Sequence, residues 1–506
     1  MIKELEITIP PVDFANVEDV RNEIAKAARI DSKAYPYYRI LRRSIDARKQ
    51  PCYHLRVEVS DKPFVFSPKF PPNYKDVSQG RPVIIVGAGP AGLFAALTLI
   101  ENGLKPVIIE KGQAIEQRKV DISRIIRTKT INPNSNWCFG EGGAGTFSDG
   151  KLFTRSSKRG NMIKVLETFV LHGANESILY DSHPHIGTDN LSRIIKSIRK
   201  TIEKYGGEYH FGKTLKDIII RNNQAVGIIT EDGETISSHA IILATGNSSR
   251  DIYELFYHKG LFMEAKPFAI GVRIEHLQSH INEIQYRSNS YDTLLPPASY
   301  QLAFTDTKGG VFSFCMCPGG IIIPASTAEN ESVVNGMSNS SRNSPFANSG
   351  IVVAINNVNS NPLSLLEFQK KCERKAFAGN ISAFGQRVCD FLENKPSTVL
   401  PKSSYLGDLK ATNLNGILPD FICERLKIGL LHFETKMKGF ITEAANLIAI
   451  ESRTSSPVRL TRNEKTLEHI QITGLYPCGE GAGYAGGITS SAIEGINTAL
   501  AIASIR

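Results

Sequence analysis

The first 60 residues alternate between strand-like and helical patterns. Residues 1–9 alternate apolar and polar positions like a half-buried strand, and residues 18–29 repeat apolar positions at the helical period. Two further strand-like runs follow, "YYRILRRSI" and "CYHLRVEVS". The next stretch, residues 61–82, is rich in proline and has no helical period. This pattern predicts a small α/β module followed by a connector.

Between residues 82 and 110 the apolar positions form continuous runs. "PVIIV" predicts a strand buried on both faces, "GAGPAG" a tight turn, and "LFAALTLI" a buried helix. "PVIIE" then predicts a second strand that ends at Glu110. The uncharged window from Pro82 to Ile100 is nearly long enough to span a membrane. Its three glycines, two prolines and strand-to-helix break favour a buried β-α-β unit instead.

The middle of the chain has a clear part and a mixed part. Residues 186–246 predict a helix, a strand and a meander of "LKDIIIR", "QAVGIIT" and "HAIILATG". Between residues 250 and 450 the signals are mixed. The asparagine- and serine-rich run before residue 350 has the composition of a disordered insert, but the buried-strand pattern "GIVVAIN" follows it directly. We therefore expect ordered loops within a second domain, with helices over residues 363–379 and 488–506.

Composition indicates the general class of protein but does not identify a binding partner. The 506 residues suit about three domains, and the apolar share of 41% with a charged share of 22% is that of a globular protein. The first residues, "MIKELEITIPP", lack the apolar core of a signal peptide, and the eight cysteines favour reduced thiols over a disulfide framework. We expect a cytoplasmic protein. The net charge of +9 suits a diphosphate, an acidic substrate or RNA and does not choose among them.

The turn between residues 87 and 92 has the residues that a dinucleotide needs. Gly87 allows the tight turn, Gly89 lets the backbone approach a pyrophosphate, and Gly92 lets the helix pack closely on the strand. Amides at the helix start face the phosphates, aided by a helix dipole worth up to about 2 kcal/mol. Glu110, at the end of the second strand, is placed to accept hydrogen bonds from a ribose.

A second glycine turn, "GEGAGYAGG", precedes the last helix and also satisfies G-x-G-x-x-G through Gly481, Gly483 and Gly486. A separate nucleotide site would need another strand after this helix, and the helix uses the remaining residues, 488–506. We therefore expect the second turn to return to the first site and to place its helix N-terminus there. The sequence predicts one dinucleotide that is contacted twice.

Several strings together resemble the uncharacterised bacterial FAD-dependent dehydrogenases, also called NAD(P)/FAD-dependent oxidoreductases, of the glutathione-reductase-like flavoprotein superfamily. They are the β-α-β unit with "ILATG" and "YPCGEGAGYAGG", the second glycine-rich loop "WCFGEGGAGTFSDGKLFTR", and "HPHIGTDNL", "FSFCMCPGG" and "ESRTSSPVR". The resemblance implies an α/β protein with a Rossmann-type FAD-binding domain, an inserted α+β substrate domain and a small N-terminal module. The expected boundaries are 1–75 for a ferredoxin-like module, 80–255 and 456–506 for the FAD-binding domain, and 256–455 for the insert.

The resemblance also implies which residues hold FAD. Glu480 stands where the superfamily commonly has an aspartate that binds the ribityl chain, and Lys151 is suited to offset phosphate or reduced-flavin charge. The full set of expected cofactor-binding residues is Gly87, Gly89, Pro90, Ala91, Gly92, Glu110, Lys111, Arg118, Gly143, Gly145, Thr146, Ser148, Lys151, Leu215, Ala244, Thr245, Gly246, Gly479, Glu480, Gly487 and Ile488.

Other candidate residues are weaker. Cys315 and Cys317 could relay electrons, but their C-x-C spacing is a poor fit to the C-x-x-C of flavin disulfide reductases, so the catalytic residues stay unassigned. His183 and His185 have a metal-ligand spacing without accompanying acids or cysteines, so no metal is expected. Arg453 and Arg459 could bind an anionic substrate or the carbonyl edge of the flavin, or could form ordinary ion pairs. Cys478 is expected to be a small packed residue and not a point of covalent flavin attachment.

The expected function is an FAD-dependent oxidoreductase that transfers hydride to or from an unassigned small molecule, with NAD(P)H as a transient donor. No dedicated nicotinamide domain remains in the chain. Two alternatives stay open: a flavin-dependent tRNA-modifying protein, favoured weakly by the basic balance and the arginines of the N-terminal module, and a flavin-binding sensor without turnover. We expect no membrane partner.

Overall fold

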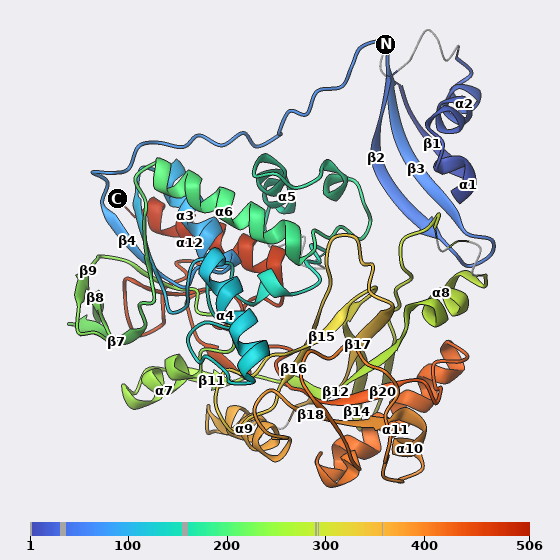
Figure 1. The fold of residues 1–506 in the computed structure, drawn as a ribbon. Helices are drawn as coiled ribbons and strands as arrows, with labels where there is room; N and C mark the ends of the chain where they lie inside the picture. The colour runs from blue at the N-terminus through green and yellow to red at the C-terminus, as the bar shows by residue number, and fades with distance from the viewer. Residues whose placement is uncertain are drawn as a thin grey trace.

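The computed structural model describes residues 3–30, 37–153, 160–288, 291, 293–356 and 358–505. It contains an N-terminal module, a central body built on a parallel sheet, and a second domain built on a larger mixed sheet (Figure 1). Among the described residues, no helix is both long and apolar enough to cross a membrane. The apolar window from Pro82 to Ile100 forms a buried strand and helix, as predicted.

The N-terminal module is a three-stranded antiparallel sheet with helices on one face. Helix α2 begins where the Asn16 side chain accepts the amide of Glu18, and its apolar side packs on the sheet. Buried residues of this module join the core of the second domain, and the Tyr53 hydroxyl donates to the carbonyl of Leu294. The elements are β1 (Lys3–Ile9), α1 (Pro11–Phe14), α2 (Val17–Ala28), β2 (Tyr37–Asp46) and β3 (Cys52–Ser60), in sheet order β1-β3-β2.

The connector after β3 contains no helix or strand, as predicted, and runs along the top of the central body in Figure 1. The Glu167 carboxylate, on helix α5 (Met162–Leu171), accepts the backbone amides of Lys69 and Phe70. These bonds hold the extended segment against the body without regular secondary structure.

The central body is a five-stranded parallel sheet with helices on one face. Alternate residues of its strands face opposite layers: Val83 and Ile85 pack under the helices, and Ile84 and Val86 pack against a small antiparallel sheet. The strands, in sheet order, are β22 (Leu475–Pro477), β10 (Ile241–Leu243), β4 (Pro82–Val86), β5 (Lys105–Glu110) and β6 (Glu208–Phe211). The helices are α3 (Pro90–Glu101), α4 (Ile115–Thr128), α5, α6 (Thr188–Lys204) and α12 (Ile488–Ser504).

The predicted meander is correct in its first two strands and wrong in its third. Strands β7 (Leu215–Arg221) and β8 (Gln224–Thr230) pair with β9 (Thr235–Ser237), whereas Ile241–Leu243 leaves this sheet and lies between β4 and β22. The reason is burial. All three residues of β10 are inaccessible, as a strand covered on both faces requires, while β9 is largely exposed.

The second domain is a seven-stranded sheet covered by helices, and the asparagine-rich run lies within it as ordered structure. The strands, in sheet order, are β13 (Ala303–Asp306), β14 (Gly309–Cys317), β17 (Phe346–Ile355), β12 (Phe268–Leu277), β20 (Asn446–Glu451), β18 (Ala383–Arg387) and β19 (Leu409–Ala411). The helices are α8 (Gln278–Tyr286), α9 (Ser364–Lys375), α10 (Val388–Leu392) and α11 (Asp420–Lys436). Two two-stranded antiparallel sheets, β15 (Ile321–Pro324) with β16 (Val334–Met337) and β11 (Met263–Ala265) with β21 (Val458–Leu460), and helix α7 (Arg250–His258) complete the part between β10 and β22.

Close packing of α12 on α3 generates the first prediction. A Cβ atom on Gly495 would stand 2.0 Å from the carbonyl oxygen of Ala91, so Gly495→Ala must push the two helices apart. We expect a loss of about 1–3 kcal/mol in the free energy of unfolding, measured by chemical denaturation. The control is Gly416→Ala, where a Cβ meets no atom within 4 Å. Equal stability of the two variants would contradict this packing.

Candidate functional site

The two glycine turns line one cavity of about 960 Å³. Strands β4, β10 and β22 are parallel neighbours, so their carboxyl ends lie at the same edge of the sheet, where open α/β sheets bind ligands. Gly87 and residues 89–91 of the first turn and residues 486–491 of the second face this shared space, and their helices α3 and α12 pack side by side (Figure 1).

Both helices point their N-termini at the cavity without a side-chain cap. Gly89 precedes α3 and Gly487 precedes α12, and neither residue offers an oxygen to the first amides of its helix. Such ends attract anions because free amides and the helix dipole both favour negative charge. A Cβ on Gly87 would come within 2.4 Å of the Ala244 carbonyl oxygen, so this turn must be glycine.

Glu110 joins three backbone segments at the edge of the cavity. Its carboxylate accepts the amides of Ala88 and Gly112, each at 2.8 Å, and that of Gly140 at 3.0 Å. A carboxylate offers about four acceptor positions, so roughly one remains for a ribose hydroxyl. The residue therefore shapes the pocket as well as lining it, which the sequence analysis did not foresee.

Arg118 lies behind the second glycine-rich loop instead of on the cavity. It is fully buried on α4, and its guanidinium donates to five backbone carbonyls. Burial lowers the pKa of Arg118 to about 10. Its role is to hold the loop that forms the cavity wall. This position does not support a direct contact between Arg118 and the cofactor. The acceptors are Asn136 at 2.9 Å, Trp137 at 3.0 Å, Gly140 at 3.2 Å, Glu141 at 2.7 Å and Gly143 at 2.9 Å.

Most of the expected cofactor-binding residues line the cavity, and four lie behind its wall. Gly92 packs against the Gly87 carbonyl, Thr146 is buried, and Gly479 lies against Ala91. Arg118 is the fourth. The residues that line the cavity are Gly87, Gly89, Pro90, Ala91, Glu110, Lys111, Gly143, Gly145, Ser148, Lys151, Leu215, Ala244, Thr245, Gly246, Glu480, Gly487 and Ile488.

Glu480 brings a buried carboxyl group to the cavity from the second glycine turn. The Asn247 side-chain amide donates to it at 3.0 Å. Burial raises the pKa of Glu480 to about 7, and the nearby Lys266 opposes this rise. A carboxyl group with such a pKa can hold or release a proton near neutral pH.

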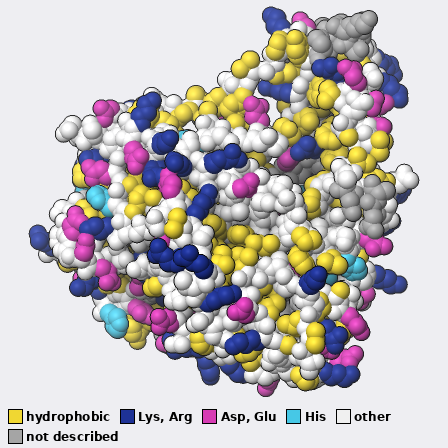
Figure 2. Space-filling view, in the orientation of Figure 1, with side chains coloured by type: hydrophobic (Ala, Val, Ile, Leu, Met, Phe, Trp, Pro, Cys, Tyr) yellow, Lys and Arg dark blue, Asp and Glu magenta, His cyan; other side chains and the backbone are white. Residues whose placement is uncertain are grey.

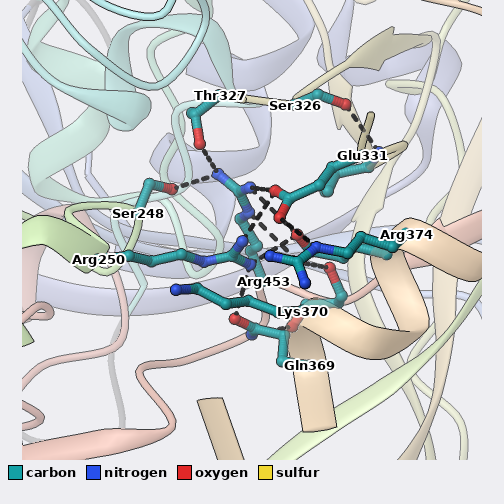
Figure 3. Close-up of polar contacts among 12 residues, drawn as sticks. Ser248, Arg250, Ser326, Thr327, Glu331, Gln369, Lys370, Arg374 and Arg453 are labelled. Carbon is teal, nitrogen blue, oxygen red and sulfur yellow. Dashed lines mark hydrogen bonds and ion pairs between the residues drawn. The ribbon is translucent and has the colours of Figure 1, made fainter. Parts of the chain in front are cut away.

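Arg453 belongs to a buried ion-pair cluster in the cavity wall, shown in Figure 3. Its guanidinium lies 3.3 Å from Glu373 and 3.7 Å from Glu331 and donates to the Thr327 hydroxyl at 2.7 Å. Arg250 pairs with the same two glutamates, at 2.6 and 2.8 Å. The two arginines and two glutamates neutralise one another, so of the roles left open for Arg453 the structure supports the ion pair.

The remaining candidate residues differ in whether they line the cavity. Arg459 lies over the Tyr484 ring at 5.6 Å and does not line the cavity, whereas His183 does. His185 contacts the Ser340 carbonyl, and the described residues contain no cluster of metal-ligating side chains. Cys478 is buried beneath the turn, where the Thr498 hydroxyl contacts its sulfur, so it is a packed thiol.

Sequence reasoning missed the far end of the cavity. Phe153, Tyr300, Gln301, Phe314 and Asn335 line it from segments widely separated in the chain. Phe153 and Phe314 lie within strings that carry the family resemblance, but nothing in those strings marks either ring as part of the cavity, and only the folded structure brings the five residues together.

Comparisons with known proteins agree with this architecture. Residues 81–256 match the family described as pyridine nucleotide-disulphide oxidoreductase, residues 267–454 match "FAD-dependent protein, C-terminal domain-like", and residues 1–60 match a domain of unknown function. An uncharacterised protein of Clostridium beijerinckii is 41% identical over 510 residues, which cover 95% of each chain. A dual trans-enoyl reductase/FAD-dependent monooxygenase of Aspergillus terreus is 25% identical over 35% of this chain and 24% of its own.

Among solved structures, similarity is more distant. A geranylgeranyl bacteriochlorophyll reductase-like protein of Thermoplasma acidophilum is 13% identical, with a TM-score of 0.37 over 84% of this chain and 78% of its own. Glycine oxidase of Bacillus cereus is also 13% identical, with a TM-score of 0.30 over 84% of this chain and 96% of its own.

The position of Arg118 generates the second prediction. In Arg118→Met, several buried carbonyls lose their donor at about 1 kcal/mol or more each, so we expect a loss of about 3 kcal/mol or more in stability. Trp137, the only tryptophan of the chain, is buried in this loop, and its fluorescence should shift to the red. Arg124→Met, an exposed position on the same helix, is the control. An unchanged emission spectrum in Arg118→Met would show that the loop does not depend on the guanidinium.

Proposed function

Because the chain belongs to the family of FAD-dependent oxidoreductases that includes its Clostridium beijerinckii relative, we propose that it is a dehydrogenase or reductase. In this proposal a reduced nicotinamide donates a hydride equivalent, and a small molecule bound in the same cavity accepts the electrons. The observation that carries the proposal is the single cavity lined by both glycine turns. The family assignment confirms the expected resemblance and the expected cofactor, FAD.

The residues present fit FAD. Glycines at positions 246, 486 and 487 have no atom within 4 Å of the place where a Cβ would stand, so they leave backbone open to a ligand. The uncapped α3 end suits the diphosphate, Glu110 a ribose hydroxyl, and the uncapped α12 end together with Lys151 the negative charge of a reduced ring. The cavity volume is at the upper end of the usual range for ligand pockets, about 300–1,000 Å³. When bound, the flavin supplies the two-electron chemistry.

The chain's own residues orient the reactants and control protons. The carboxyl group of Glu480 is held by Asn247 and titrates near neutral pH, so it can take or give a proton at its free oxygen. Tyr300 and Phe314 of the second domain contribute aromatic rings to the lining of the cavity. Among the described sheets, only the central one is parallel throughout, so a nicotinamide must share this cavity instead of binding a second nucleotide domain.

The structure offers little support for the tRNA alternative. Its main sequence argument was the arginines of the N-terminal module, and most of them are paired with acids. Figure 2 shows this module standing out from the body, with side chains of both charges beside the hollow between them. The pairs are Arg39 with Glu58, Arg43 with Asp181, Arg48 with Asp46 and Arg56 with Glu4. Titration with NADH and NADPH distinguishes the sensor alternative from an oxidoreductase.

The third prediction concerns the first turn. A Cβ on Gly89 would meet only the Gly143 Cα, at 3.9 Å, so Gly89→Val can fold, but its methyl groups enter the space proposed for the diphosphate. We expect FAD affinity to fall about a hundredfold, equivalent to about 3 kcal/mol, with an unchanged circular dichroism spectrum. Gly416→Val, at an exposed glycine outside the cavity, should retain the cofactor. Full retention of FAD by Gly89→Val would show that the diphosphate binds elsewhere.

The fourth prediction tests the proposed reaction. The purified protein should be yellow, and anaerobic titration with NADH and with NADPH should bleach its visible absorbance with at least one of them. A yellow protein that neither nicotinamide bleaches would argue against the proposed donor and for the sensor. A colourless protein that cannot take up FAD would contradict the assignment of the cavity.

A further inference from the structure

Two cysteines stand close together on strand β14 at the cavity wall. Cys315 and Cys317 are separated by one residue, Met316, near the end of this strand. Cys315 lines the cavity, whereas Cys317 is completely buried behind it. The Cys317 thiol donates to the backbone carbonyl of Cys315 at 3.3 Å. One sulfur thus faces the ligand space, and the other is inside the protein within reach of the first.

The backbone at this pair has an unusual conformation. Pairing of β14 with β17 shifts register between Phe314 and Cys317, and Cys315 has a φ of 45°, a left-handed value that a cysteine rarely adopts. Such a conformation costs on the order of 1–3 kcal/mol and persists where the surroundings enforce it, often at functional sites. The bulge is what turns the Cys315 side chain into the cavity wall while keeping Cys317 in the core.

Three donors hold this conformation. The Arg273 guanidinium donates to the Cys315 carbonyl at 2.5 Å, and the Cys317 thiol contacts the same carbonyl at 3.3 Å. The Lys151 ammonium, from the glycine-rich loop of the central body, donates to the Met316 carbonyl. Arg273 is itself fixed by Glu451 at 2.6 Å and by Asn348 at 2.7 Å. The pair is therefore built in from both domains.

The surroundings make the two thiols unequal. The hydrogen bond from Cys317, followed by the positive charges of Lys151 and Arg273, lowers the pKa of Cys315 to about 5, against burial and the charge of Asp149. The same hydrogen bond and burial raise the pKa of Cys317. The carboxyl groups of Glu451 and Glu480, whose pKa values burial raises to about 7, and the Tyr300 hydroxyl also face the pair. These shifts favour the thiolate form at Cys315 and the thiol form at Cys317.

We propose that Cys315 and Cys317 are a redox-active dithiol and that the electron acceptor of this site is a small disulfide. The proposal rests on the proposed function, in which the hydride equivalent of the nicotinamide supplies the two electrons and the one proton that return the disulfide to a Cys315 thiolate and a Cys317 thiol. A small acceptor follows from the position of the sulfur, which lies in the wall of a cavity and not on a convex surface that a folded protein could approach.

The reaction is two successive exchanges. The Cys315 thiolate attacks one sulfur of a disulfide R–S–S–R, so a bond forms between Cys315 and one RS group, and the other RS group leaves as a thiolate. Cys317 then loses its proton and attacks the Cys315 sulfur, which releases the second RS group as a thiolate. The protein is left with a Cys315–Cys317 disulfide. It has lost two electrons, and the substrate has gained them.

The fifth prediction traps the intermediate and reads it by mass. The reduced full-length protein is incubated with hydroxyethyl disulfide, and peptides are mapped by mass spectrometry. The wild type should yield a peptide cross-linked between Cys315 and Cys317. Cys317→Ser should keep a mercaptoethanol adduct on Cys315, and Cys315→Ser should give neither product. Cys138→Ser is the matched control: Cys138 lines the same cavity but bonds the Ala325 carbonyl and has no thiol partner, and its loss should leave the cross-link intact.

The pH dependence of alkylation is an independent readout. A thiolate with a pKa near 5 stays reactive to iodoacetamide between about pH 8 and pH 6, whereas an ordinary thiol slows about tenfold per pH unit. Cys317→Ala removes the main cause of the low pKa and should move the Cys315 profile to higher pH. Cys52, on the N-terminal module, is the internal reference, because burial raises the pKa of its thiol.

The outcomes separate this proposal from the proposed function. If the protein holds FAD that a nicotinamide bleaches, but Cys315 acquires no adduct in Cys317→Ser, the dithiol is refuted and the oxidoreductase stands. An adduct on Cys138 with none on Cys315, or a Cys315 profile parallel to that of Cys52, also refutes it. If the cross-link forms but no nicotinamide bleaches the flavin, the dithiol stands and the proposed donor is wrong.

Discussion

The structure depends on the parallel pairing of β10 with both β4 and β22. Residues 241–243 bond to residues 84–86 on one side and to 475–477 on the other, so segments almost 400 residues apart end at the same edge of one sheet. The direction of each following helix is then settled, because a helix that leaves a parallel strand must fold back over the sheet. This arrangement aims two helix N-termini at one space. A slip of β22 by one residue would turn its side chains to the opposite layer and withdraw the second turn from the cavity.

Buried polar side chains, and not only apolar packing, shape the walls of this space. Arg118 and Glu110 hold irregular loops by bonding backbone carbonyls and amides that no sheet or helix satisfies. A buried charge is tolerated only when it is paired or fully hydrogen-bonded. Because five carbonyls surround Arg118, its guanidinium is solvated by the backbone itself. The glycine-rich loop can therefore remain free of regular structure and still present a fixed surface to a ligand.

Local sequence patterns predicted the strands and helices well. They did not show which segments far apart in the chain contact each other. The continuous apolar run at residues 83–86 and the final helix at 488–504 follow from periodicity alone. The assignment of β10 to the meander failed because a three-residue apolar run has the same local pattern in either sheet; only burial on both faces distinguishes them. Arg118 was grouped with the cofactor residues because no local pattern shows whether an arginine faces a ligand or the backbone behind it. The bulge at Cys315 depends on Arg273 and Lys151, which lie far from it in the chain.

Because its ion pairs neutralise Arg453, the positive charge of the cavity must come from other groups. Two arginines and two glutamates in that wall cancel, and Arg342 is paired with Asp149. The two uncapped helix ends lie on the side of the central body, and so does Lys151, whose ammonium is also 3.9 Å from Asp149. Electrostatic attraction for an anionic cofactor is thus concentrated on one wall, while the opposite wall supplies rings and thiols. Because Lys151 also bonds the carbonyl of Met316, its side chain connects the wall of the central body directly to the cysteine bulge.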